Sequence, residues 1–187
     1  MTVRPIVISG DPVLHSPATP VTSFDAELRK LIADMYETMD EAPGVGLAAP
    51  QIGVPLRVFV YDYPADDGTA RRGVAVNPEL FISPTPVSEP TEADDEGCLS
   101  FPGERFPLIR ADKAILRAHD ENGAAFEIEC EGWFARIMQH EFDHLNGLLY
   151  VDRLAHAEAK QAEKARKTNG WGKPGLSWMP GVDDLDG

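Results

Sequence analysis

The stretch QHEFDH at residues 139–144 decides the fold, and it lies late in an apolar run that begins at Trp133. His140 and His144 are four residues apart, so in an α-helix they lie on one face, about one turn from each other. Both imidazoles can then reach a single divalent metal ion, and Glu141 beside the first can hold a proton near water on that ion. The alternative is a helix whose histidines only hydrogen-bond inside a core.

The neighbouring residues predict that this helix is buried and runs from about residue 132 to residue 145. Apolar side chains go most of the way round such a helix, at Trp133, Phe134, Ile137, Met138, Phe142, Leu145 and Leu148. Polar side chains inside a core need partners, and one metal ion can satisfy several of them together. Asp143 is expected to serve the surrounding structure rather than to bind the metal.

Composition bounds the class of protein. The 187 residues suffice for one domain with a sizeable core, and 43% hydrophobic residues are ordinary for a globular chain. A formal net charge of −14 argues against direct sequence-specific nucleic-acid binding, which needs a basic surface. Neither a membrane span nor a secretory leader is visible, so we expect a cytoplasmic protein without membrane partners. A disulfide between Cys98 and Cys130 is therefore not expected, and a thiolate ligand is the better role for one of them.

The chain before the first glycine cluster predicts an arm and a helix. Residues 1–22 are rich in proline and predict an extended segment that lies on the body. From Phe24 onward apolar residues recur at helical spacing, with Ser23 or Asp25 placed to cap the start. This helix should end before Pro43.

Strands and loops are expected in the middle of the chain. The glycines of GVG at residues 44–46 predict a loop with freedom to adopt positive φ. Asn122-Gly123 predicts a hairpin turn. Strands are predicted at residues 56–61, 73–77, 113–119 and 126–130, either because β-branched and aromatic residues are frequent there or because apolar and polar residues alternate.

A second helix with a mildly basic surface is expected at residues 154–167, and the simplest interpretation of that surface is a solvated face. The segment 169–187 is too rich in glycine and proline for a helix, but it contains Trp171 and Trp178. Because exposed tryptophans are unfavourable, we expect this tail to dock on the body. The division is thus one catalytic domain at residues 1–168 and a docked tail at 169–187.

A catalytic metal site needs a third protein ligand and an open position. One protease pattern requires histidine at position 150, where this chain has Tyr150. A second pattern uses a downstream glutamate, for which Glu158 and Glu163 are available. The third candidate lies upstream, at Cys98 in a tight turn that contains glycine.

Three blocks of the sequence resemble the three motifs of peptide deformylases. They are GVGLAAPQ at 44–51, EGCLS at 96–100 and QHEFDH at 139–144, in the family's order and at compatible separations. The resemblance covers about residues 3–166, and the tail resembles an extension found in one branch of the family. It implies an α+β fold in which antiparallel β-sheets pack around the metal-binding helix, with a C-terminal helix and an extended tail.

The resemblance also implies an enzyme, a metal-dependent hydrolase that removes the formyl group from N-formylmethionyl nascent peptides and releases formate. Its metal ligands would be Cys98, His140 and His144, a tetrahedral donor set that leaves one position open. Glu141 would move the proton, while the Gln51 amide and the Leu99 backbone N–H would stabilise the oxyanion. The resemblance points to Fe²⁺ in the cell, with Zn²⁺, Ni²⁺ or Co²⁺ as substitutes.

Substrate contacts follow from the same blocks. Backbone at Val45, Gly46 and Gly97 is expected to pair with the peptide edge-on. Val45, Trp133 and Ile137 are expected to form an apolar pocket for the methionine side chain. Arg136 would line its rim with the charged head in water, and Glu96 would brace the Cys98 turn.

Two rival functions remain at this point. A zinc endopeptidase would use the same helix with Glu163 as the third ligand. A non-enzymatic protein would keep the metal for structure and dock on the ribosome through the basic helix at 154–167. For the deformylase interpretation, a ribosome contact would be transient.

Overall fold

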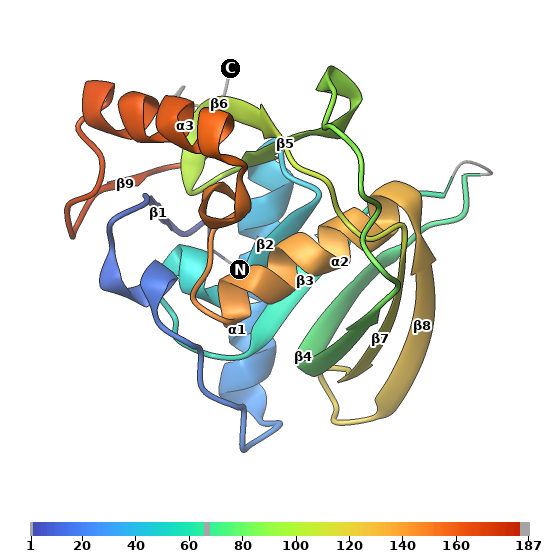
Figure 1. Ribbon diagram of the computed structural model, residues 1–187. Helices are drawn as coiled ribbons and strands as arrows, with labels where there is room; N and C mark the ends of the chain where they lie inside the picture. Colours follow the sequence, from blue (N-terminus) through green and yellow to red (C-terminus); the bar gives the residue numbers. More distant parts are fainter. Residues whose placement is uncertain (1, 66–67, 184–187) are drawn as a thin grey trace.

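The computed structural model describes residues 2–65 and 68–183. Its central element is α2 (Gly132–Leu145), which packs against β2 (Gly46–Ala48), β3 (Val58–Asp62), β4 (Arg72–Ile82), β7 (Lys113–His119) and β8 (Ala125–Glu131). Figure 1 shows α2 passing through the middle of the molecule, with β4, β7 and β8 on one side of it. The predicted helix and its bounds are confirmed.

Five antiparallel strands form the main sheet in the order β2-β3-β4-β7-β8. Alternate residues of β3 lie on its two faces, so Val58 and Val60 join one apolar cluster while Phe59 and Tyr61 join another. The first cluster contains the buried face of α1 (Ala26–Glu41), and the second contains the buried face of α2. The sheet therefore lies between the two helices, and the expected α+β class is confirmed.

The remaining strands form two small sheets. β5 (Asp95–Cys98) pairs with β6 (Phe101–Pro107), and β1 (Ile6–Val7) pairs with β9 (Ser177–Trp178), both antiparallel. Short 3₁₀ segments connect these elements, at Pro12–His15, Ala49–Ile52, Glu92–Asp94 and Tyr150–Arg153.

Local sequence signals explain where α1 and the β7–β8 hairpin begin and end. The Asp25 carboxylate accepts hydrogen bonds from the backbone N–H groups of Glu27 and Leu28, both at 3.0 Å, as an N-cap does. The hairpin turns at Gly123, whose φ of +84° suits glycine. The predicted cap at Asp25 and the predicted hairpin are both confirmed.

The strand expected at 73–77 is longer than its pattern indicated, because β4 continues to Ile82. Proline at position 78 has no backbone N–H to donate to a neighbouring strand. The register between β4 and β7 shifts between Val76 and Glu79, so the proline lies in a β-bulge. Within the bulge Asn77 has a φ of +51°. Its side chain accepts from Val21 N at 2.8 Å and donates to Val21 O at 2.9 Å. The bulge thus ties the N-terminal arm to the sheet.

The C-terminal part begins with α3 (His156–Thr168), of which only Ala162 is buried. Beyond it, Trp178 is 3% exposed and lies opposite Ile6 in the β1–β9 pair. Residues 169–183 are described, whereas residues 184–187 of the predicted tail lie outside the described residues, and the division at residue 168 stays a prediction. Among the described residues, no helix is long and apolar enough to cross a membrane.

Asn77→Ala is expected to lower the free energy of unfolding by about 1–3 kcal/mol, because Val21 loses both side-chain partners and alanine is strained at positive φ. Urea denaturation followed by circular dichroism measures this loss. As a control, Asn169→Ala at an exposed position should change stability by no more than about 0.5 kcal/mol. Equal midpoints for the two variants would contradict the assigned role of Asn77.

Candidate metal centre

Three potential ligands converge from two elements. His140 and His144 come from α2, and Cys98 comes from the end of β5. The Nε2 atoms of the two histidines are 3.2 Å apart, and Cys98 Sγ lies 3.4 Å from His144 Nε2. All three donor atoms lie within 4.8 Å of one another, and the three residues form a possible metal group. The structure thus brings together the three residues predicted to bind metal.

These separations fit a tetrahedral ion. With metal–nitrogen bonds of about 2.0–2.1 Å and tetrahedral angles, two nitrogen ligands are separated by about 3.4 Å. The observed 3.2 Å between the two Nε2 atoms is close to that edge. A thiolate with two imidazoles suits zinc, ferrous iron, nickel or cobalt and leaves a fourth position for a reactant.

A buried carboxylate sets the tautomer of His140. Glu96 Oε1 lies 2.7 Å from His140 Nδ1, and a carboxylate can only accept, so Nδ1–H donates. In the neutral imidazole Nε2 then carries no proton and can bind a metal, which is the arrangement typical of metal-ligating histidines. Glu96 was expected to brace the Cys98 turn, but its contacts orient His140 instead.

Arg110 holds Glu96 in place and joins it to α2. The Arg110 guanidinium donates to Glu96 Oε1 at 2.6 Å and to Asp143 Oδ2 at 2.6 Å, and all three side chains are buried. Burial by itself would raise the pKa of Glu96, but its hydrogen bonds with His140 and Arg110 outweigh burial and hold that pKa well below its usual value. Asp143 also pairs with Arg153, which agrees with its predicted structural role.

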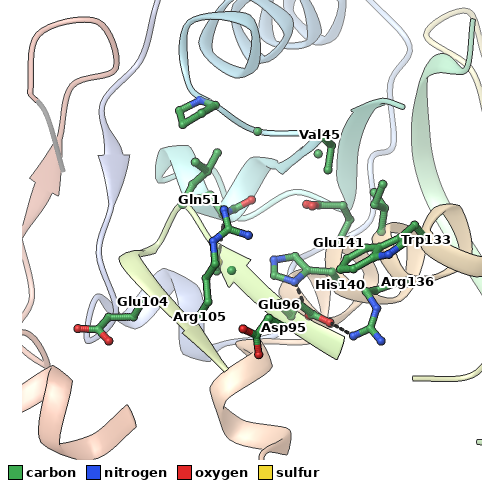
Figure 2. A pocket seen from close by; sticks show the side chains of 17 residues that line it. Val45, Gln51, Asp95, Glu96, Glu104, Arg105, Trp133, Arg136, His140 and Glu141 are labelled. Carbon is green, nitrogen blue, oxygen red and sulfur yellow. Dashed lines mark hydrogen bonds and ion pairs between the residues drawn. The ribbon is translucent and has the colours of Figure 1, made fainter. Parts of the chain in front are cut away.

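Arg136 lies elsewhere than expected. Its head was predicted to reach water at the rim of the pocket, but the residue is 9% exposed and donates to Leu108 O at 2.6 Å and Glu96 Oε2 at 3.0 Å. Figure 2 shows its guanidinium turned toward Glu96, under the ring of Trp133. The buried charge of Glu96 explains this placement. Helical spacing puts Arg136 on the buried face of α2, and this spacing could have predicted that its side chain is buried.

Glu141 lies beside the metal group in a narrow space against β2. It is 3% exposed, its Oε2 has no hydrogen-bond partner in the described part of the chain, and burial raises its pKa to about 7. A Cβ atom on Gly46 would lie 2.3 Å from Glu141 Oε1. The freedom to adopt positive φ, which was the predicted use of these glycines, is not used at Gly44 or Gly46. Gly46 is needed because a carboxylate approaches its Cα.

Two hydrogen-bond donors adjoin the same group. Gln51 is 1% exposed, and its Oε1 accepts from Ala48 N at 2.8 Å, which turns the amide NH₂ away from Ala48. That NH₂ lies 3.7 Å from Cys98 Sγ and 3.4 Å from Ser100 Oγ. The backbone N–H of Leu99 has no acceptor among the described residues, so it is available to donate.

A cleft of about 200 Å³ opens next to these groups. Ile137 is buried within it, while Val45 and Trp133 are each about half exposed at its rim. Figure 2 shows Val45, Gln51, Glu141 and Trp133 around this space. The residues predicted to contact substrate all line it, namely Val45, Gly46, Gly97, Trp133 and Ile137.

The remaining candidates lie apart from the metal group. Both cysteines are free, and Cys130 is a buried member of the apolar cluster around α2, as predicted. Glu163 forms ion pairs with Arg166 and Lys167 on α3, and it is not part of the metal group found in the described residues. The endopeptidase alternative therefore loses its third ligand. His15 and His156 are exposed.

Comparison with known proteins gives one consistent result. A family model described as polypeptide deformylase matches residues 3–160. The chain is 53% identical over 186 residues to a protein named peptide deformylase 2 from Corynebacterium efficiens, covering 98% of this chain and 96% of that protein. It is 55% identical over 187 residues to a peptide deformylase from Rhodococcus opacus, covering 97% of this chain and 95% of that protein.

Solved structures agree. A peptide deformylase from Legionella pneumophila has a TM-score of 0.77 and 41% identity, covering 90% of this chain and 95% of that chain. A peptide deformylase from Ehrlichia chaffeensis, solved in complex with actinonin, has a TM-score of 0.77 and 34% identity, covering 90% of this chain and 98% of that chain.

The two cysteines provide a matched test of the metal group. Cys98→Ala is expected to lose the bound metal. Removing a residue that only hydrogen-bonds to a metal ligand lowers metal affinity roughly 10–100-fold, and removing a ligand itself lowers it more. Cys130→Ala should keep one ion per chain, since Cys130 lies outside the metal group. Elemental analysis of both variants after zinc loading measures this. Retention of the metal by Cys98→Ala together with its loss from Glu163→Ala would support the endopeptidase site instead.

Proposed function

The chain belongs to the polypeptide deformylase family and is a metal-dependent hydrolase that removes the N-formyl group from nascent peptides; we propose that Cys98, His140 and His144 hold its metal. The single observation that carries this assignment is the convergence of three donor atoms at tetrahedral separations beside a buried glutamate. We further propose Fe²⁺ as the ion in the cell, with Zn²⁺, Ni²⁺ or Co²⁺ as substitutes, because a thiolate and two imidazoles accept each of them.

The metal, when bound, supplies a Lewis acid that can lower the pKa of water from 15.7 to about 7. The protein contributes the orientation of the ligands. Glu96 holds His140 by its Nδ1–H, and Arg110 holds Glu96, so neither needs to reorganise during the reaction.

Glu141 moves the proton in this proposal. Its free Oε2 accepts a proton from the attacking water and then passes it to the departing amine nitrogen of methionine. Such acid–base catalysis contributes about 10²–10⁴-fold in rate. The absence of a side chain at Gly46 leaves room for the carboxylate to reach the reacting atoms.

Gln51 and Leu99 stabilise the negative charge that forms on the formyl oxygen. The Gln51 Oε1 accepts a hydrogen bond from Ala48 N, which orients the Gln51 NH₂ toward Cys98. The Leu99 N–H has no acceptor among the described residues. Donors that are already oriented before the reaction are worth more than donors that must turn, and losing one typically costs about 10²–10³ in kcat.

The substrate peptide binds along the free edge of β2 in this proposal. β2 pairs with β3 on one side only, so backbone at Val45 and Gly46 can pair with an extended peptide, with Gly97 opposite. The methionine side chain then enters the cleft between Val45, Trp133 and Ile137. Its aliphatic chain fits an apolar wall, while the formyl group lies next to Glu141.

We place the reaction in the cytoplasm, on nascent chains, with a transient ribosome contact. The support for that contact is the solvated surface of α3, where Lys160, Lys164 and Lys167 are exposed. A basic surface on a chain with a net charge of −14 suits brief contact with an anionic partner.

Formate release from formyl-Met-Ala-Ser by anaerobically prepared, iron-loaded protein tests the proposed function. Acetyl-Met-Ala-Ser is the matched substrate, and it should be rejected because its extra methyl has to fit where only hydrogen fits. Equal turnover of both peptides, or cleavage of an internal peptide bond, would contradict a deformylase site.

Glu141→Gln separates metal binding from proton transfer. We expect it to bind one metal ion normally and to release formate at least about 10²-fold more slowly, because an amide cannot accept the proton. Glu163→Gln, at a partly exposed position on α3 outside the metal group, should retain wild-type turnover. Full activity of Glu141→Gln would favour the rival in which the metal is structural.

A further inference from the structure

The turn that follows Cys98 lacks the backbone conformation typical of a two-residue hairpin. Leu99 and Ser100 connect β5 to β6, with Cys98 and Phe101 as partners across the hairpin. Two-residue hairpins favour turns with positive φ, whose twist matches that of the strands. Neither Leu99 nor Ser100 has positive φ, since Asn77 is the one non-glycine residue with it in the described part of the chain. The register between β5 and β6 also shifts between Gly97 and Cys98, so contacts from outside the hairpin can set the conformation of this turn.

Two distant segments supply those contacts. The Trp178 indole Nε1–H donates to Leu99 O at 2.8 Å, and the backbone N–H of Ser9 donates to Ser100 O at 2.8 Å. The carbonyls of both turn residues are thus engaged by the chain termini. Trp178 is 3% exposed and shares an apolar cluster with Leu99, so its hydrogen bond is shielded from water.

Trp178 is itself firmly held. It lies opposite Ile6 in the β1–β9 pair, and Ile8 N donates to Leu176 O at 2.9 Å just before it. The catalytic groups contact the same turn through other atoms, since Gln51 Nε2 lies near Ser100 Oγ and Cys98 Sγ. The tail and the metal group therefore share one short turn.

We infer that Trp178 is a positioning residue that fixes the Leu99 backbone N–H for the oxyanion. This inference rests on the proposed function, because it gives the Leu99 N–H the role assigned there. The physical link is short: peptide units are planar, so only the φ and ψ of Leu99 separate the carbonyl held by Trp178 from that N–H. An N–H displaced by a fraction of an ångström loses part of its stabilisation of the oxyanion.

Trp178→Phe tests the inference, with Trp171→Phe as its matched control. Both substitutions remove the same atoms from the same tail. The Trp171 indole packs against the Phe101 ring and against two apolar clusters, but it makes no hydrogen bond in the described structure. For Trp178→Phe we expect kcat to fall about 10-fold with KM nearly unchanged, less than the roughly 10²–10³-fold for losing an oxyanion donor outright. Trp171→Phe should keep kcat within about 2-fold, since positioning is not disturbed.

A second measurement does not depend on activity. In zinc-loaded, ¹⁵N-labelled protein, the amide resonances of Leu99 and Ser100 should shift or broaden in Trp178→Phe and stay in place in Trp171→Phe. Should Trp178→Phe fail to fold, benzothienylalanine at position 178 alone keeps the bicyclic shape of the indole and replaces its N–H with a sulfur atom that cannot donate. It should then give the same fall in kcat and the same amide shifts.

The outcomes are distinct. A fall in kcat with shifted Leu99 and Ser100 amides supports the inference. If the wild type is active and both position-178 variants keep its kcat and its Leu99 and Ser100 amide resonances, the inference is overturned and the proposed function stays intact. A wild type that releases no formate overturns the proposed function, and with it the catalytic role given to Trp178.

Discussion

The buried hydrogen bond between Glu96 and His140 is the interaction on which the site depends. Glu96 lies on β5 and His140 on α2, so the bond connects the two elements that supply the metal ligands. Arg110 and Arg136 neutralise the carboxylate, and Asp143 completes the network next to His144. Buried ion pairs are weak evidence for stability, because desolvation offsets their attraction. This network is better explained by geometry: through Glu96 it fixes the tautomer and the position of the His140 imidazole before any ion arrives.

The rest of the fold positions this network. Alternation along β3 lets one strand supply an apolar surface to α1 on one face and to α2 on the other, which fixes α2 against the sheet. Gly46, where β2 begins, then admits the Glu141 carboxylate at a distance that any side chain would prevent. The termini hold the turn after Cys98 through Ser9 and Trp178. Catalytic groups thus come from a helix, a strand, a 3₁₀ segment and a turn whose relative placement is set by burial.

Much of the fold and of the site could be predicted from the sequence wherever one local signal dominates. The apolar run from Trp133 gave the bounds of α2, and Asn122-Gly123 gave the hairpin, because helical periodicity and turn chemistry are properties of neighbouring residues. The roles of Gly46 and Arg136 could not be predicted, since both depend on residues brought near by folding, Glu141 and Glu96. The continuation of β4 past Pro78 likewise depends on a bulge opposite β7. Arg110 lies in an irregular segment, where no periodicity marks it as buried.

The central claim is that one sulfur and two imidazole nitrogens bind a single ion. X-ray absorption spectroscopy of zinc-loaded protein at the metal edge tests it most directly. The account predicts one sulfur neighbour at about 2.3 Å and two imidazole nitrogens at about 2.0–2.1 Å, with one lighter ligand completing four-coordination. A coordination shell made only of nitrogen and oxygen would contradict it, because Cys98 would then lie outside the metal centre.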